Sequence, residues 1–181
     1  MTHLCIYHSS NLVQPVRLLN HADDIAGELA AIGVDFTRQP LSGRFDWGRA
    51  QADVLAEQEG WIAPLQEQHP LEVVELACIA EGDAQAAARH ADTQAEHVLA
   101  GDEWRYFLAG RARISFHVDG HVYALRCSGG DRLHIPAGVK RWFELGDQPR
   151  VVFIRLCRST AGCQPQLTGD PVASACQPFE D

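Results

Sequence analysis

The sequence has no long hydrophobic segment and little positive charge. No apolar run in its 181 residues approaches the roughly 18 that a membrane-spanning helix needs. The first residues, MTHLCIYHSS, lack the basic start and apolar core of a secretory signal. With 15 Lys and Arg against 24 Asp and Glu, the formal charge of −9 argues against general nucleic-acid binding. We therefore predict a cytoplasmic protein that binds neither membranes nor nucleic acid, while a small anionic ligand held by a few arginines stays compatible with this charge.

The chain also lacks a C-x-x-C pair, although it has six cysteines. These are Cys5, Cys78, Cys127, Cys157, Cys163 and Cys176. Their spacing matches no zinc ribbon, and without an export signal we expect free thiols in a reducing compartment. Nine histidines raise the question of a metal site, but a single histidine is more often a surface or hydrogen-bonded residue than a ligand.

Hydrophobic patterning divides the chain into three parts of one domain, residues 1–181. Residues 1–96 form an N-terminal strand and helical part. From 97 to 158, short apolar runs alternate with glycine turns, a pattern typical of an antiparallel barrel or sandwich. Residues 159–181 form a polar tail that we expect to cover one end of the barrel. The predicted fold is therefore mainly β with flanking helices.

Individual elements follow from local periodicity. Amphipathic patterns predict a helix within residues 20–36 that Gly33 ends, and further helices over residues 49–68 (interrupted near Gly60 and Pro64) and 81–97. LCIYH and LEVVELACI are typical of strands, the second of them buried. WRYFLAG is predicted to end in a glycine turn, and Asp-Gly between ARISFHV and HVYALRC predicts a hairpin.

Two spacings in the strand-rich part suggest a metal site with pieces missing. His97 and Glu103 lie in EHVLAGDE, and Arg141 follows PAG in GGDRLHIPAGVKR. With histidine in place of Leu99 and Arg141, these would be the two metal motifs of a cupin barrel. Three imidazoles and one carboxylate would then bind one divalent ion, with open positions for substrate and oxygen.

Across almost the whole chain the sequence resembles the bacterial acireductone dioxygenases, a cupin family. The matching segments, in order, are LNHADDIAGELAAIGVDFTR, EHVLAGDEWRYFLAG, HVDGHVYALRC, GDRLHIPAGVKRWFELG, FIRL and LTGDPVAS. The resemblance implies a cupin-type antiparallel barrel (jelly roll), a monomer, and a place in methionine salvage. Members bind Fe(II) or Ni(II) and cleave an acireductone with O2.

The departures from the family pattern fall on the metal ligands. The family motif E-H-x-H-x-x-x-E-V-R-F is matched by His97, Glu103 and Arg105 but not by Leu99, and Arg141 stands where the family has its fourth ligand. Leucine has no donor atom, and a guanidinium has no free lone pair. A fixed positive charge about 5 Å from a dication costs roughly 6–7 kcal/mol at an effective dielectric near 20. We therefore predict a degenerate site that keeps two of the four metal ligands, His97 and Glu103. The protein is expected to have no cofactor, or to bind Fe(II) or Ni(II) if a metal is bound.

The resemblance also places Arg105 and Arg155 near the substrate. We take Glu103, Arg105 and Arg155 as candidate catalytic residues, and Glu103 and Arg105 share strand parity, so both should point into the barrel. The alternative is that the arginines face outward. In place of the ion we predict an Arg141–Glu103 ion pair with His97 hydrogen-bonded nearby. Removing Arg141 alone should cost about 2–4 kcal/mol, and removing both partners less.

Several functions remain open at this point. The favoured hypothesis is an acireductone-dioxygenase-like cupin with a degenerate metal site and altered activity on a small anionic enol or keto-acid ligand. The alternatives are a true Fe(II)- or Ni(II)-dependent acireductone dioxygenase and a non-catalytic small-molecule-binding cupin. A further alternative is a metal-free enzyme that uses His97 and Glu103 as acid and base. Whether the chain is an enzyme is left undecided by the sequence.

Overall fold

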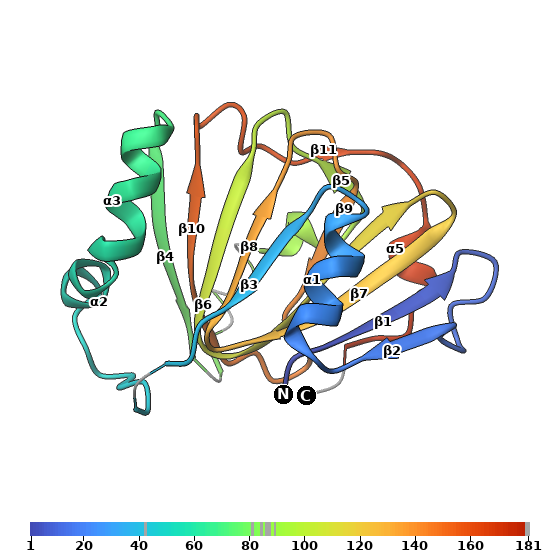
Figure 1. Ribbon diagram of the computed structural model, residues 1–181, viewed down its shortest axis with the longest axis horizontal. Coiled ribbons are helices and arrows are strands. Elements are labelled where there is room, and N and C mark those ends of the chain that lie inside the picture. The colour runs from blue at the N-terminus through green and yellow to red at the C-terminus, as the bar shows by residue number, and fades with distance from the viewer. Residues whose placement is uncertain (42, 81, 84, 86–87, 89, 180–181) are drawn as a thin grey trace.

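One long strand organises the molecule. The computed structural model describes all residues except 42, 81, 84, 86–87, 89 and 180–181. Strand β6 (Glu103–Val118) has 16 residues and belongs to two antiparallel sheets. Its first half pairs with β8 and β10, and its second half pairs with β7 and β9. Because β6 continues from one sheet into the other, the sheets enclose a common interior (Figure 1), and the predicted mainly β, cupin-type barrel is confirmed.

The strand order is as follows. The first sheet runs β11 (Gln166–Leu167), β5 (His97–Val98), β9 (Arg141–Glu144), β6, β7 (His121–Ser128), β1 (His3–His8) and β2 (Arg17–Leu19). The second runs β4 (Val73–Ile79), β10 (Val151–Cys157), β6, β8 (Asp131–Ile135) and β3 (Asp35–Arg38). Every β-ladder named here is antiparallel.

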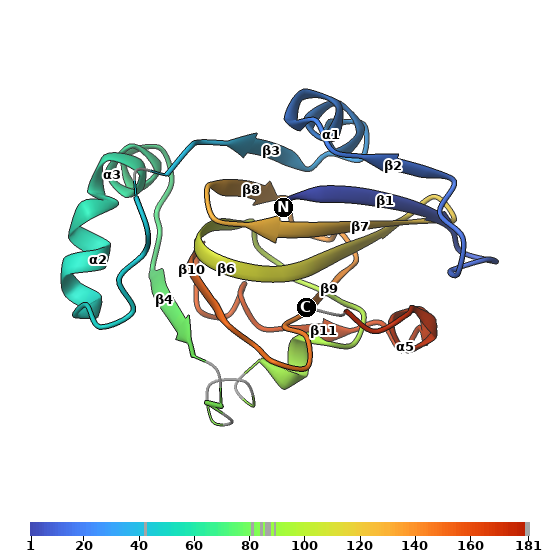
Figure 2. The same cartoon turned by 90° about the horizontal axis from the view of Figure 1, so that it is seen from below.

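Alternation along β6 separates an inner from an outer face. Phe107 packs inside the barrel with Phe143 and Phe153, whereas Trp104 and Tyr106 belong to a second cluster on the outer face. That outer cluster is covered by α2 (Gln51–Glu57) and α3 (Glu59–Gln68), which lie beside β4 in Figure 2. Because side chains alternate along a strand, Glu103 and Arg105 lie on the Phe107 side, in the interior.

The N-terminal helices differ in detail from the prediction. Helix α1 (Ala22–Ala30) buries Ile25 and Leu29, and the chain then turns at Gly33, whose φ of +80° suits glycine. Residues 35–38, which lie beyond the predicted helix end at Gly33, form β3, a strand that the sequence did not predict. The second predicted helix breaks at Gln58, earlier than expected; Pro64 lies within α3, where it removes one backbone donor without ending the helix.

Two strand predictions need correction and one hairpin is confirmed. Gly110, expected to end WRYFLAG in a turn, lies within β6 at φ +71°, and a Cβ there would be 1.8 Å from the Arg150 carbonyl oxygen. The strand therefore continues past a close approach that only glycine permits. Strand β4 is only half-buried, because it pairs with β10 alone. The hairpin turn has Asp119 at φ 48° and Gly120 at φ 72°, as an Asp-Gly turn requires.

The segments around the barrel complete the fold. The helix predicted over 81–97 falls largely outside the described residues; its described end holds η1 (Ala91–Thr93) and leads into β5. In the C-terminal tail, α5 (Val172–Ala175) packs Val172 against Val122 and Trp142. None of the helices within the described part of the chain is long and apolar enough to cross a membrane.

The cysteines are not all free thiols. Cys157, the last residue of β10, and Cys163 form a disulfide, contrary to expectation, because the chain turns back over the five residues between them and brings their Cα atoms to 6.1 Å. Cys127 is fully buried in the barrel core, where its role is packing.

Candidate functional site

Glu103 is the centre of a buried ionic cluster inside the barrel. Its side chain is fully buried. Oε1 accepts hydrogen bonds from Arg105 Nε at 3.0 Å and Arg155 Nε at 2.6 Å, and Oε2 accepts one from Arg141 Nη1 at 3.1 Å. The predicted Arg141–Glu103 ion pair is therefore present, but it is one of three. Three guanidiniums around one carboxylate, with half-exposed Glu75 a second partner 3.8 Å from Arg155 Nη1, leave positive charge in excess.

Strand register explains why these groups meet. Arg105 on β6 and Arg155 on β10 are directly opposite each other in the ladder, and Cys157 is opposite Glu103. Arg141 begins β9 and is opposite His97 on β5. Like charges directly opposite each other repel, so Glu103 stabilises the Arg105–Arg155 pair by bonding to both through one oxygen.

Arg141 is fixed in the interior by more than the carboxylate. Its Nε donates to the Val139 carbonyl oxygen and its Nη2 to that of Pro136, each at 3.2 Å. Only Nη1 reaches Glu103, so the pair is not the two-bond contact that a guanidinium and a carboxylate can form. With 1% of its side chain exposed, Arg141 is a built-in part of the barrel rather than a mobile surface group.

Arg105 has an unused hydrogen-bond donor. Its guanidinium carbon lies 4.3 Å from the Phe143 ring centroid and 5.4 Å from that of Phe153, so two aromatic faces stabilise the charge. Its Nη1, however, is buried without a hydrogen-bond partner among the described residues. A buried unpaired donor is unfavourable, and a ligand oxygen placed against it would remove that cost.

The electrostatics keep the cluster charged. Burial would raise the pKa of Glu103, but the nearby Arg105, Arg155 and Arg141 outweigh it and hold that pKa well below its usual range. Burial lowers the pKa of Arg141 to about 10, with Glu103 opposing the shift, and burial also lowers the pKa of Arg105. At neutral pH the Glu103 carboxylate is therefore ionised and Arg141 remains protonated.

His97 lies next to this cluster as a neutral imidazole. It is 2% exposed, and burial lowers its pKa, with the positive charge of Arg141 adding to the effect. Its Nδ1 is 2.9 Å from the Ala95 carbonyl oxygen. Because a carbonyl can only accept, Nδ1 carries the proton and Nε2 keeps a lone pair. His97 is thus hydrogen-bonded near the cluster as predicted, to the backbone rather than to an ion pair.

The residues present do not fit a divalent ion at this position. Leu99 is 1% exposed and offers no donor atom. Arg141 cannot ligate, and both oxygens of Glu103 already accept from guanidiniums. An ion would have to displace Arg141 from three hydrogen bonds and then be held by His97 and Glu103 beside two further positive charges.

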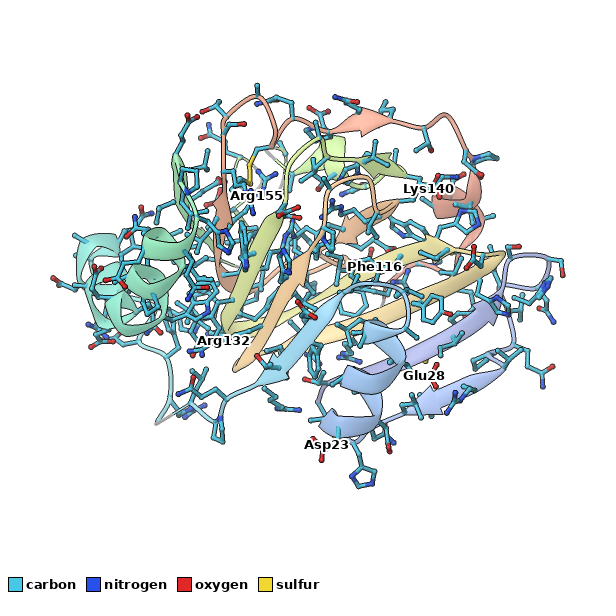
Figure 3. All side chains as sticks on the ribbon, turned by 45° about the horizontal axis from the view of Figure 1, so that its top comes forward. Asp23, Glu28, Phe116, Arg132, Lys140 and Arg155 are labelled. Atoms are coloured by element: carbon cyan, nitrogen blue, oxygen red, sulfur yellow. A yellow bond between two sulfur atoms is a disulfide. The ribbon has the colours of Figure 1, made fainter. Side chains whose placement is uncertain are left out.

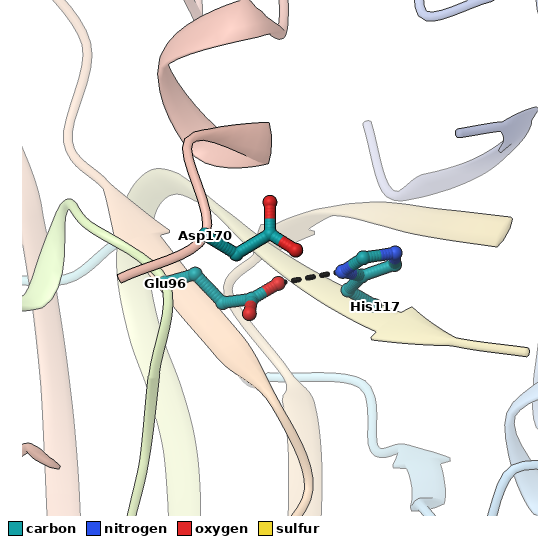
Figure 4. A group of neighbouring side chains, drawn as sticks. All are labelled: Glu96, His117 and Asp170. Carbon is teal, nitrogen blue, oxygen red and sulfur yellow. Dashed lines mark hydrogen bonds and ion pairs between the residues drawn. The ribbon is translucent and has the colours of Figure 1, made fainter. Parts of the chain in front are cut away.

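A second acidic cluster lies at the edge of the barrel (Figure 4). The possible ligand atoms of Glu96, His117 and Asp170 lie within 4.8 Å of one another. Glu96 already accepts from His117 Nδ1 at 2.7 Å and Thr168 Oγ1 at 2.6 Å, and Lys140 Nζ is 3.7 Å away. These donors satisfy both carboxylate oxygens without an ion, so this cluster joins the C-terminal segment to the barrel.

Sequence reasoning missed the loop that borders the main cluster. The Cys163 carbonyl oxygen accepts from Arg155 Nη2 at 2.9 Å, and Figure 3 shows Arg155 close to the yellow disulfide bond. The Gly101 N–H donates to the Gly162 carbonyl at 3.1 Å, which holds the same loop against the segment before Glu103. The sequence signal that could have indicated this loop is the pair of cysteines at its ends, six residues apart.

Comparison with known proteins agrees with this architecture. The ARD/ARD' family model matches residues 51–165. Acireductone dioxygenases of Pseudomonas paraeruginosa and Stutzerimonas stutzeri are 36% and 34% identical over 181 residues, covering all of both chains in each case. The solved acireductone dioxygenase from Bacillus anthracis, with a cadmium ion in its active centre, has a TM-score of 0.78 at 20% identity. That match covers 92% of this chain and 98% of the other, and at such identity it shows the fold alone.

Proposed function

Because this chain belongs to the acireductone dioxygenase family, we propose that it is a cupin in which Arg141 has replaced the metal ion and arginines bind a small anion directly. The ligand class is a planar enol or 2-keto acid that carries two neighbouring oxygens. The activity is accordingly altered from that of a metal-dependent dioxygenase.

One observation carries this proposal: Glu103 has three arginine partners and no free oxygen for a metal. The cluster keeps positive charge in excess even when the Glu75 contact of Arg155 is counted, and Arg105 Nη1 points to no acceptor among the described residues. Excess buried positive charge and an unused donor together favour an anion with an oxygen directed at Arg105.

The residues divide into contacting and positioning groups. In this proposal Arg105 and Arg155 contact the ligand, and Glu103 holds their guanidiniums apart and aligned. Glu103 is ionised and fully bonded, so it is a poor proton acceptor, which weakens the acid–base pair considered from the sequence. Any proton transfer falls to His97, whose Nε2 carries the lone pair that a base needs.

A second candidate is a true Fe(II)- or Ni(II)-dependent acireductone dioxygenase. The full-length identity to such enzymes favours it. It requires Arg141 to leave the Val139 and Pro136 carbonyls and Glu103 to exchange arginines for an ion. This candidate predicts one tightly bound Fe(II) or Ni(II) ion per chain, whereas the anion-binding proposal predicts far less than one.

The deciding experiment combines metal analysis with calorimetry. Protein incubated with Fe(II) or Ni(II) and desalted should hold far less than one ion per chain. After chelator treatment it should bind oxalate, a minimal planar dianion, and lose that binding in Arg105→Gln. Arg132→Gln is the matched control, because Arg132 packs on Tyr106 and Trp61 outside the barrel. Stoichiometric metal held by His97 and Glu103, or oxalate binding unchanged in Arg105→Gln, would refute the proposal.

A further inference from the structure

We propose that Cys157–Cys163 is a reversible redox site whose reduction releases Arg155 and opens the Glu103 cluster to its ligand. The ligand consequence rests on the proposed function; the release of Arg155 does not. The reaction partners of this redox site are low-molecular-weight thiols, which reduce the disulfide, and their disulfides, which form it again.

A short chain of contacts links the sulfur atoms to Glu103. The disulfide fixes Cys163 at the end of β10. The Cys163 carbonyl accepts from Arg155 Nη2, and Arg155 Nε donates to Glu103 Oε1. Arg155 is thus held by the buried carboxylate, by a carbonyl whose position depends on the sulfur–sulfur bond, and more loosely by Glu75, 3.8 Å from its Nη1.

The loop between the cysteines also stands on the side from which the cluster can be reached. Among the three arginines, Arg155 has 16% of its side chain exposed, against 3% for Arg105 and 1% for Arg141. Solvent therefore approaches the cluster beside Arg155, where Cys163 and its neighbours lie. A ligand that enters by this route must displace the loop.

Few contacts besides the disulfide hold the loop closed. Cys163 N–H bonds back to Ser159 within the loop, and the Gly162 carbonyl accepts from Gly101. On the outside, Thr160 N–H donates to Glu72 at 3.3 Å. Next to Cys157, Arg158 is held by an ion pair with Asp102 at 3.2 Å and by its carbonyl, which accepts from Glu72 N–H. Removing the covalent link therefore leaves Arg158 in place and only single hydrogen bonds on residues 159–163, which exchange more readily with water.

The redox step balances as thiol–disulfide exchange. An external thiolate attacks Sγ of Cys163, the more exposed of the two residues at 5% against 1% for Cys157, and Cys157 leaves as a thiolate. A second external thiolate attacks the external sulfur of this mixed disulfide and Cys163 leaves as a thiolate. Two electrons pass from the external thiols, which become a disulfide, and the two protein thiolates take up protons.

The test follows Arg155 itself, without relying on ligand binding. Guanidinium N–H NMR signals of Arg155, identified by their loss in Arg155→Lys, are compared in oxidised protein and after dithiothreitol. We expect separate Nη signals in the oxidised state and averaging by rotation after reduction. Oxalate association should become about tenfold faster once the charge-assisted hydrogen bond is lost. Cys157→Ser/Cys163→Ser should match the reduced protein, and Cys78→Ser should keep the wild-type response.

Each result decides a different point. Identical Arg155 signals in both states, or two free thiols after treatment with glutathione disulfide, would overturn the redox site. Altered Arg155 signals with equal oxalate rates would overturn the opening of the cluster. Altered signals without any oxalate binding would support release of Arg155 and refute the proposed function instead.

Discussion

Two buried glutamates lie seven residues apart, at either end of the segment that leads into β6, and their surroundings differ. Glu96 is 1% exposed and Glu103 is fully buried. Glu96 bonds to His117 and Thr168, and Lys140 Nζ is 3.7 Å away. Thr168 belongs to the C-terminal segment. Glu103 bonds to three arginines from three strands.

The difference separates a structural junction from a candidate binding site. Around Glu96 the donors match the two carboxylate oxygens, and the result fastens Thr168 to the barrel. Around Glu103 the positive charge exceeds what one carboxylate neutralises, and Arg105 keeps an unused N–H. Burial alone therefore does not indicate function; unbalanced charge in a buried cluster does.

The largest expected effect is on metal affinity. Leu99→His/Arg141→His should create a three-imidazole, one-carboxylate site and tighten Ni(II) binding by about four orders of magnitude, or about 5–6 kcal/mol. Titration followed by elemental analysis measures it, with Glu96→Gln as the control that leaves the new site intact. The comparison of the two glutamates breaks if wild-type protein binds Ni(II) tightly and Glu96→Gln abolishes that binding.

The next effect compares the two carboxylates directly. Glu103→Gln should lower the free energy of unfolding by about 3–5 kcal/mol, because three buried guanidiniums lose their anion. Glu96→Gln should cost about 1–2 kcal/mol, since the amide still bonds to Thr168 and Lys140 reaches solvent. Urea unfolding of both variants gives the two values. Equal losses would mean that both clusters are structural junctions of the same kind.

Removing Arg141 should cost less than removing Glu103. Arg141→Met is expected to lower the free energy of unfolding by about 2 kcal/mol, because Oε1 of Glu103 keeps Arg105 and Arg155 while Oε2 loses its partner. The sequence-based prediction that removing both Arg141 and Glu103 costs less than removing Arg141 alone treated them as an isolated pair. Because Glu103 also bonds to Arg105 and Arg155, we now expect the double variant to be less stable than Arg141→Met. A double-mutant cycle without coupling would show that the Arg141–Glu103 contact contributes nothing.

The smallest expected effect is on the free energy of unfolding at acidic pH. The folded-state pKa of Glu103 lies below its unfolded value near 4.5, so its contribution is complete above that pH and is lost as the pH falls. Wild-type protein should therefore lose up to about 1.4 kcal/mol per pH unit more than Glu103→Gln below about pH 4.5. Unfolding curves between pH 7 and 3 test this, and parallel curves for the two proteins would contradict it.

The barrel could be predicted from sequence because its signals are local or match the family. Strand runs and the Asp119-Gly120 turn mark the hairpin of β6 and β7, and the segment around Glu103 matches the family motif. The position of Arg141 opposite His97 follows from the same alignment of motifs. The Arg141–Glu103 ion pair could therefore be predicted before any coordinates.

The other arginine partners of Glu103 could not be predicted, because they depend on the register between strands that are distant in sequence. Parity showed that Arg105 points inward but not that Arg155 lies directly opposite it on the same oxygen. Whether Cys157 and Cys163 meet depends on the path of the loop, not on their spacing. Gly110 was misread because a close backbone approach and a turn both favour glycine.

The length and sharing of β6 also affect how the chain reaches this structure. Arg155 meets Glu103 across 52 residues of sequence, and Thr2 bonds to Ser128 across 126. Contacts of such separation are slow to form, since loop closure must precede their stabilisation, and β-rich topologies of this kind fold in milliseconds to seconds. During synthesis β1 can pair with β2 early, but its other edge stays unpaired until β7 emerges, when more than two thirds of the chain has been made.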